Sequence, residues 1–220
     1  MHSPTRGNLA DMALVTEAEM LGLRKKIAKA DPAFKPILSR SPLCTIGRKR
    51  TRQSHYQTLV ESILSQQLAV KAADTIIKRV SDLVGGDFAV EKMNALTLNQ
   101  LRAAGASGAK AKSIFELTDA TLAGDLHFSR YGRMSSDAIS EELTAIWGIG
   151  RWTVEMFLMF HLGRLDVWPT GDLGVRRGWE RIHSLKKEIT PKELEKFSTT
   201  FEGYQSVVAW YCWRALEKED

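Results

Sequence analysis

Asp172 is the carboxylate whose place in the sequence most suggests chemistry. It follows Pro169-Thr170-Gly171, which interrupts regular structure, and it precedes a stretch with helical spacing. A carboxylate at that point either caps the helix, by accepting amide hydrogens of its first turn, or stabilises positive charge on a bound substrate. The sequence leaves both roles open.

A second unusual stretch is Gly148-Ile149-Gly150-Arg151, which opens a largely apolar helical segment. Glycine accepts a positive φ angle and leaves no Cβ in the path of an approaching group. Amides at a helix N-terminus bind phosphate, helped by the helix dipole. A tight helical connection with glycine at the C-cap explains the same residues, and for an isolated G-x-G it is the commoner case.

Helical spacing of apolar residues runs through nearly the whole chain, which predicts an all-α protein. Glycine and proline mark the linkers between the segments. The predicted helices span about 17–30, 54–84, 97–104, 108–123, 136–145, 150–163, 172–184, 191–199 and 204–217.

The net charge and the cysteines of the chain limit the classes of protein to which it could belong. The chain has 220 residues with a formal net charge of +5, which is compatible with a polyanionic partner and equally with many enzymes. Its two cysteines, Cys44 and Cys212, have no metal-ligand spacing, which argues against a disulfide framework, a zinc site and an iron–sulfur cluster. We expect no membrane span and no signal peptide, hence a cytoplasmic protein, associated with the nucleoid if bacterial.

Four separated motifs together resemble the helix–hairpin–helix DNA glycosylase superfamily. The hairpin motif reads IWGIGRWT at 146–153, and Asp172 follows it about twenty residues later. The other three are LVESILSQQLAVKAADTIIKRV (59–80), LRAAGASGAKAKSIFELT (101–118) and YQSVVAWYCWRA (204–215). The resemblance implies two helical lobes with an active-site cleft between them. One lobe is 16–50 with about 165–220, the other is 51–164 with the hairpin at about 136–163, and 1–15 form a flexible arm.

The residue after the hairpin arginine separates branches of this family. Bifunctional members carry a lysine there, which attacks the sugar and forms a Schiff base; this chain has Trp152. The resemblance therefore implies the compact form of the 3-methyladenine DNA glycosylase II branch. Such an enzyme flips alkylated purines, 3-methyladenine and also 7-methylguanine, out of double-stranded DNA and hydrolyses the N-glycosidic bond in base excision repair. It has no lyase activity, requires no cofactor and is expected to act as a monomer.

The same resemblance assigns roles around the flipped base. Asp172 would stabilise the positive charge that develops on the sugar. A purine alkylated on its ring carries positive charge, and an aromatic face attracts a cation. Trp152 is the first choice for that wall, with Tyr56 and Trp168 as further candidates. We assign the remaining tryptophans of the C-terminal third to core packing: Trp179, Trp210 and Trp213.

DNA contacts are implied as well. Gln67, with Leu68 beside it, would fill the gap that the flipped base leaves. The hairpin (Gly148, Ile149, Gly150, Arg151 and Thr153) would clamp one phosphate through its amides, and Lys110 would contact another. The carbonyls of Thr144, Ile146 and Ile149 match positions that hold a structural Na⁺ or K⁺ in such hairpins. Trp147 stands where the family has a proline.

Two other readings stay open. One is a catalytically weak or inactive helix–hairpin–helix protein that only binds DNA, although a pure binder has no use for a carboxylate that repels phosphate. The other is a glycosylase for neutral lesions such as hypoxanthine or ethenoadenine, which need more acid assistance than the sequence visibly offers.

Overall fold

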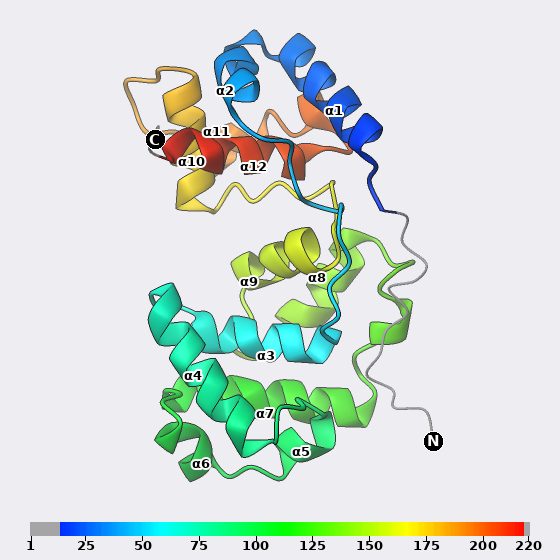
Figure 1. Cartoon of the computed structure of the whole chain (residues 1–220), viewed down its shortest axis with the longest axis vertical. Coiled ribbons are helices and arrows are strands. Elements are labelled where there is room, and N and C mark those ends of the chain that lie inside the picture. The colour runs from blue at the N-terminus through cyan, green and yellow to red at the C-terminus, as the bar shows by residue number, and fades with distance from the viewer. Residues whose placement is uncertain (1–13, 218–220) are drawn as a thin grey trace. The chain divides into compact units, whose positions relative to one another are not determined.

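The computed structural model describes residues 14–217, and every regular element within this range is helical (Figure 1). The predicted all-α fold is confirmed. The arm predicted at 1–15 lies outside the described residues, apart from its last two positions. Between residues 14 and 217, no helix combines the length and the apolar character that crossing a membrane requires.

The chain folds into two compact units. Unit 1 contains Thr51–Phe157, and unit 2 combines the described residues of Ala13–Arg50 and of Leu158–Asp220. Unit 1 holds the hairpin, and unit 2 holds Asp172.

Unit 1 is built around α3 and α7, which pack against each other. α4 lies on α3, while α5 and α6 lie on α7 (Figure 1). Its elements are α3 (His55–Ser65), α4 (Val70–Leu83), α5 (Val90–Asn94), α6 (Leu98–Ala103), α7 (Gly108–Ala123), η3 (Phe128–Arg130), α8 (Ser136–Thr144) and α9 (Arg151–Met156). α9 runs on into η4 (Phe157–His161), a π-helical segment.

Serine side chains set the starts of the three helices that position the hairpin and its neighbours. Ser54, Ser107 and Ser135 each accept a hydrogen bond from the amide three residues later, at the N-termini of α3, α7 and α8. Each bond satisfies an amide that would otherwise have no partner within its helix.

The single helix predicted over 54–84 is wrong. The chain leaves helical geometry after Ser65 and resumes it at Val70, and Gln67 has a φ of 57°. Lys110 stabilises the end of α3, because its Nζ donates to the carbonyl of Leu64 over 2.7 Å. The helical spacing of apolar residues continues across the break, so the sequence pattern does not reveal it. The short helix α2 (Lys35–Arg40) and α5 were also not predicted.

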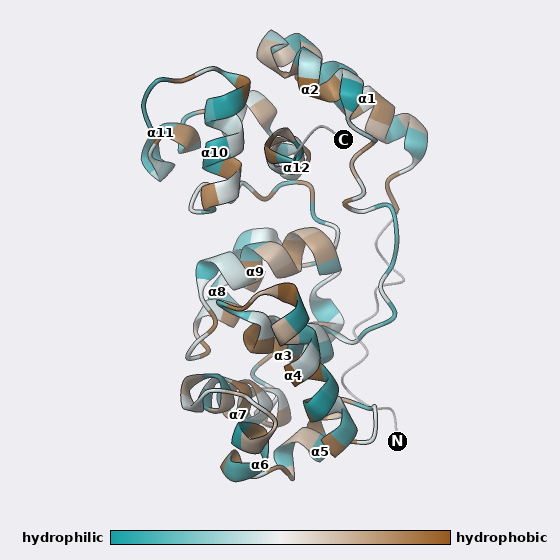
Figure 2. Ribbon diagram, turned by 60° about the vertical axis from the view of Figure 1, so that its left-hand side comes forward, coloured by the Kyte–Doolittle hydropathy of each residue, from teal (hydrophilic) through white to brown (hydrophobic). Residues whose placement is uncertain are grey.

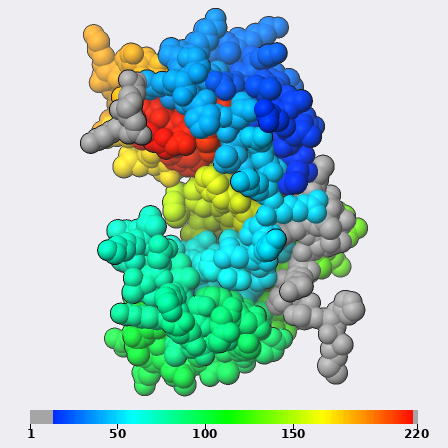
Figure 3. All heavy atoms as spheres, in the orientation of Figure 1, coloured from blue at the N-terminus to red at the C-terminus, as the bar shows by residue number. Residues whose placement is uncertain are grey.

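Unit 2 is organised around α12 (Gln205–Leu216), whose residues from Gln205 to Cys212 are all buried. Figure 2 shows α12 end-on, with α10 (Leu173–Ile182) on one side and α2 on the other. The remaining elements are α1 (Glu17–Ala30), η2 (Pro32–Phe34), α11 (Pro191–Glu195) and η5 (Thr199–Phe201). In the space-filling view, α12 borders the N-terminal helices (Figure 3).

Gly178 lets α10 and α12 approach closely. A Cβ at this position would lie 2.0 Å from the carbonyl oxygen of Cys212, so only glycine fits. The close crossing brings together Asp172, which begins α10, and its partner Trp213, which lies on α12 next to Cys212.

Candidate functional site

The hairpin between α8 and α9 depends on Gly148. This residue has a φ of 84°, in the left-handed region, and an added Cβ would lie 2.6 Å from Oγ of Ser113. Both its conformation and its packing therefore require glycine. Ile149 is buried, whereas Gly150 is exposed at the N-cap of α9 with nothing within 4 Å of an added Cβ. The backbone at Gly150 is open to a ligand.

Gln66 joins the hairpin to the loop after α3. Its Nε2 donates to the carbonyl of Gly148 over 3.2 Å and to Oγ1 of Thr153 over 3.3 Å. Each bond joins residues that are more than eighty positions apart in the chain, so the spacing of residues in the sequence could not predict it. Gln66 was not among the predicted site residues.

Gln67 and Leu68 lie on that loop, at the surface. Gln67 is exposed in its left-handed conformation, and Leu68 is 40% exposed. Val70, at the start of α4, is 77% exposed. A surface loop that presents apolar side chains beside a polar one suits insertion into a base stack, and the role assigned to Gln67 stays a prediction.

Two cations predicted to contact DNA have partners within the protein. Nε of Arg151 donates to Oε1 of Glu155 over 2.9 Å, although the Arg151 side chain is 78% exposed. Lys110 holds the Leu64 carbonyl, and its partial burial lowers the pKa of the ammonium. An ammonium has three donors, so the bond to Leu64 leaves Lys110 with further hydrogen-bonding capacity.

The three aromatic candidates for the base-binding wall differ in their exposure to solvent. Trp152 is 50% exposed on α9, as a base-stacking residue requires. Tyr56 is fully buried, and its hydroxyl lies 2.6 Å from Oγ1 of Thr118; burial raises the pKa of this phenol. Trp168 is buried too, and its Nε1 donates to the carbonyl of Leu194 over 3.1 Å. The prediction that Tyr56 and Trp168 form a base-binding wall is wrong, because both rings belong to packed cores.

Asp172 caps α10. Its Oδ1 accepts a hydrogen bond from the amide of Val175 over 2.8 Å and another from Nε1 of Trp213 over 2.9 Å. The carboxylate is half-buried. The capping role is therefore confirmed, and the catalytic role is compatible with it, since the two donors fix the direction of the carboxylate.

The assignment of the three C-terminal tryptophans to the core is wrong for Trp213. Trp179 and Trp210 are buried, but Trp213 is partly exposed and points its indole nitrogen at Asp172. Phe160, 54% exposed on the π-helical segment η4, lies 5.7 Å from Trp213 between ring centroids. An accessible aromatic pair thus adjoins Asp172 within unit 2.

The predicted monovalent cation site stays a prediction. The carbonyl of Ile146 accepts the amide of Ile149 over 3.1 Å, which leaves one of its lone pairs for an ion. Residues 14–217 hold no cluster of three or more His, Cys, Asp or Glu side chains arranged for a metal ion.

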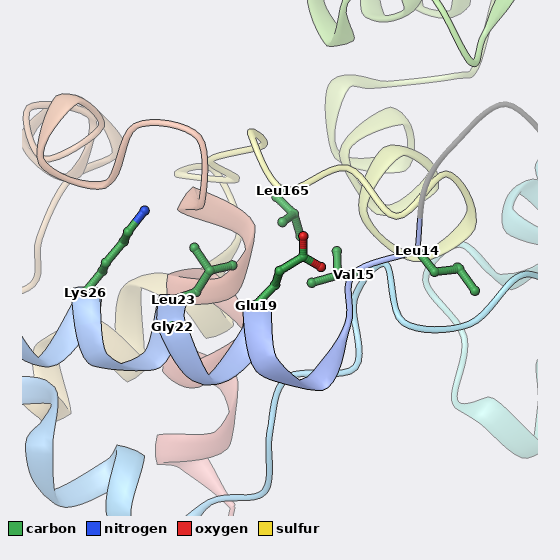
Figure 4. A pocket seen from close by; sticks show the side chains of 7 residues that line it. All are labelled: Leu14, Val15, Glu19, Gly22, Leu23, Lys26 and Leu165. Atoms are coloured by element: carbon green, nitrogen blue, oxygen red, sulfur yellow. The ribbon is translucent and has the colours of Figure 1, made fainter.

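A groove of about 440 Å³ lies on unit 2 along α1 (Figure 4). It contains none of the predicted site residues. The residues around it come from the start of the described chain, from α1 and from the segment before α10: Leu14, Val15, Glu19, Gly22, Leu23, Lys26 and Leu165.

The sequence profile of the HhH-GPD superfamily of base excision DNA repair proteins matches residues 60–201. DNA-3-methyladenine glycosylase 1 of Schizosaccharomyces pombe is 35% identical over 177 residues, which cover 79% of this chain and 78% of the relative.

Solved structures of DNA glycosylases are also similar to this chain. A DNA-3-methyladenine glycosidase from Bacillus halodurans superposes with a TM-score of 0.78 at 34% identity, covering 88% of each chain. The 3-methyladenine DNA glycosylase of Schizosaccharomyces pombe, solved in complex with abasic DNA, superposes with a TM-score of 0.74 at 31% identity. That match covers 87% of this chain and 95% of the other.

Proposed function

This chain belongs to the HhH-GPD superfamily of base excision DNA repair proteins, and on that premise we propose that it excises alkylated purines from double-stranded DNA. It is a monofunctional DNA glycosylase of the 3-methyladenine type, a hydrolase of N-glycosyl bonds. 3-Methyladenine is its proposed main substrate, with 7-methylguanine as a second one.

The observation that carries the proposal is the setting of Asp172. Two neutral donors, the Val175 amide and the Trp213 indole, hold one oxygen of a half-buried carboxylate at the start of a helix. A carboxylate fixed in this way needs little reorganisation when positive charge develops nearby, which is how preorganised groups stabilise a transition state.

The reaction is a heterolytic cleavage. The bond between C1′ of the sugar and the purine nitrogen breaks, and its electron pair goes to the base, which neutralises the positive charge on the alkylated ring. The sugar takes up oxocarbenium character, which Asp172 stabilises. Water then adds to C1′ and loses one proton, leaving an abasic site and the free base. An already cationic leaving group explains why no strong general acid is required.

Recognition of the base rests on aromatic faces. Trp152 is half-exposed, and aromatic faces attract cations by about 0.5–2 kcal/mol, depending on solvation. Gln67, with Leu68, is proposed to occupy the gap in the stack. The exposed backbone at Gly150 supports a phosphate contact by the hairpin amides.

The absence of lyase activity follows from Trp152. A Schiff base with the sugar needs a lysine amine at this place, and tryptophan has none. Borohydride should therefore trap no covalent complex between the enzyme and abasic DNA. We further propose that the enzyme acts as a monomer in the cytoplasm, at the nucleoid in a bacterium. It requires no cofactor, and a Na⁺ or K⁺ at the hairpin would have a structural role only.

Release of free bases from methylated duplex DNA tests the proposal. The wild type should release 3-methyladenine and leave the abasic strand uncut. Asp172→Asn keeps an oxygen that can accept both hydrogen bonds but removes the charge, so it should bind DNA and lose most base release. Asp74→Asn, at an exposed position on α4, is the matched control and should behave as wild type.

Other outcomes identify the other readings. DNA binding without release of any base from methylated, hypoxanthine or ethenoadenine substrates would make Asp172 a helix cap alone and the protein a DNA binder. Release confined to hypoxanthine or ethenoadenine would replace the alkylated substrates by neutral ones.

A further inference from the structure

Lys112 and Trp147 form an exposed pair at the edge of the hairpin. Nζ of Lys112 lies 4.2 Å from the centroid of the Trp147 ring, and the indole is 47% exposed. The next residue on each side is in contact too, since Ser113 lies directly under Gly148. Two consecutive residues of α7 therefore face two consecutive residues of the turn, which fixes Lys112 relative to the hairpin backbone.

We propose that Lys112, held by the Trp147 ring, contacts a DNA phosphate adjacent to the one bound by the hairpin amides. This inference rests on the DNA-binding role proposed for the hairpin and adds a second phosphate contact to it. Lys112 is the contacting residue, and Trp147 is a positioning residue that acts through it.

The chemistry of the pair suits a phosphate. The ring attracts the ammonium through its face, and this leaves N–H donors directed at solvent for a phosphate oxygen. The ion pairs formed among residues 14–217 do not include Lys112. Its positive charge is therefore not neutralised by a carboxylate at short range and remains available to a polyanion.

Positioning explains why a bulky ring is useful in the turn. A lysine side chain loses much rotational freedom when it is fixed on a ligand, and this loss opposes binding. The Trp147 ring restricts Lys112 before DNA arrives, so less freedom is lost on binding. Proline in the same place would stiffen the turn but would offer no aromatic face to an ammonium.

The salt dependence of DNA binding tests the phosphate contact. Affinity for an abasic duplex is measured by fluorescence anisotropy over a series of NaCl concentrations, because each phosphate contact contributes about −0.9 to the slope of log K against log salt. Lys112→Gln should reduce the magnitude of that slope by about 0.9 and weaken binding about three- to tenfold at moderate salt. Lys78→Gln removes a charge from the same unit, where Lys78 is paired with Asp82, and should keep the wild-type slope.

Variants of the ring test the positioning role. Trp147→Leu should weaken binding and lower the slope, Trp147→Phe should keep most of both, and Trp147→Leu combined with Lys112→Gln should bind no more weakly than Lys112→Gln alone. If Trp147→Leu unfolds thermally at the same temperature as the wild type, the half-exposed ring is not needed for folding.

The outcomes separate this inference from the proposed function. If Lys112→Gln has the wild-type slope while the wild type releases alkylated bases, the inference is wrong and the function stands. If the effects of the two substitutions simply add, Trp147 does not act through Lys112 and the positioning role is wrong. If the wild type does not bind duplex DNA, both proposals fail.

Discussion

The indole nitrogen of Trp213 donates to Oδ1 of Asp172 over 2.9 Å, and this bond ties the C-terminal helix α12 to the start of α10. Asp172 and Trp213 are 41 residues apart, and they meet because Gly178 allows α10 and α12 to cross with almost no space between them. The same oxygen also accepts the Val175 amide. The carboxylate is thus oriented by two helices rather than by its own turn alone.

Trp213→Phe should slow base release while DNA affinity is retained. Phenylalanine keeps a ring beside Phe160 but has no donor for Asp172. A hydrogen bond to a charged group contributes about 1.5–3 kcal/mol, so the single-turnover rate should fall about ten- to hundredfold. Trp210→Phe, on the same helix but in the core, should retain the rate. An unchanged rate in Trp213→Phe would mean that the indole does not orient the carboxylate.

Gly174→Ala tests the same relationship without altering either partner. A Cβ at Gly174 would lie 2.8 Å from Cδ1 of Trp213 and 3.1 Å from Oδ1 of Asp172, so the indole must move. We expect a rate loss similar to that of Trp213→Phe in the same single-turnover assay. Gly171→Ala is the control, because an added Cβ there meets nothing within 4 Å. Equal loss in both variants would point to a general effect on the loop before α10.

Features that depend on neighbouring residues could be predicted from the sequence, whereas contacts between distant residues could not. The cap at Asp172 and the turn at Gly148 are local features, so a break, a capping residue and helical spacing were enough to place them. The indole partner of Asp172 depends on a helix crossing, and spacing along the chain carries no information about it. The burial of Tyr56 and Trp168 was missed for the same reason, since an aromatic residue can equally serve a core or a ligand.

The break at Gln67 shows a different limit. Apolar residues on both sides keep helical spacing, and glutamine is a good helix former, so the pattern favours one continuous helix. Contacts from elsewhere override it: Lys110 takes the carbonyl of Leu64, and Gln66 bonds the hairpin. No glycine or proline between residues 59 and 80 marks the break.

Gly148→Ala and Gly150→Ala should separate folding from DNA binding. Alanine at 148 must adopt a φ of 84° and would contact Ser113 at 2.6 Å, so we expect a loss of stability of about 1–3 kcal/mol in urea unfolding. Alanine at 150 has room and an ordinary backbone conformation, so stability should stay at the wild-type level. Its methyl group would instead stand where DNA approaches, and affinity for abasic duplex should fall. Wild-type affinity in Gly150→Ala would argue against a close backbone contact.

His55 should make the protein less stable in mild acid. Burial lowers the pKa of His55 to about 4, whereas an unfolded histidine has a pKa near 6.5. Between these values the unfolded chain binds a proton that the folded chain does not, so stability falls as pH drops below about 6.5 and the loss is complete near pH 4. By pH 5 the loss should be about 2 kcal/mol.

His55→Phe provides the comparison for that pH effect. Phenylalanine fits a site that already holds the rings of Phe128, Tyr131 and Phe157, and it does not titrate. Urea unfolding from pH 7 to pH 5 should therefore show a much flatter pH dependence in the variant. The same decline in both proteins would assign the acid sensitivity to other groups.

Gln67→Gly should uncouple base release from DNA binding. Glycine adopts a φ of 57° without strain, so the loop should keep its conformation and the stability should change by no more than about 1 kcal/mol. The side chain proposed to fill the vacated stack is lost, and a flipped base should return to the helix more readily. We expect unchanged affinity for undamaged duplex and a slower release of 3-methyladenine. The fluorescence of 2-aminopurine next to the lesion, which rises when the stack opens, should rise less than with the wild type. Wild-type fluorescence and release in Gln67→Gly would assign the filling of the stack to Leu68 or to another residue of the loop.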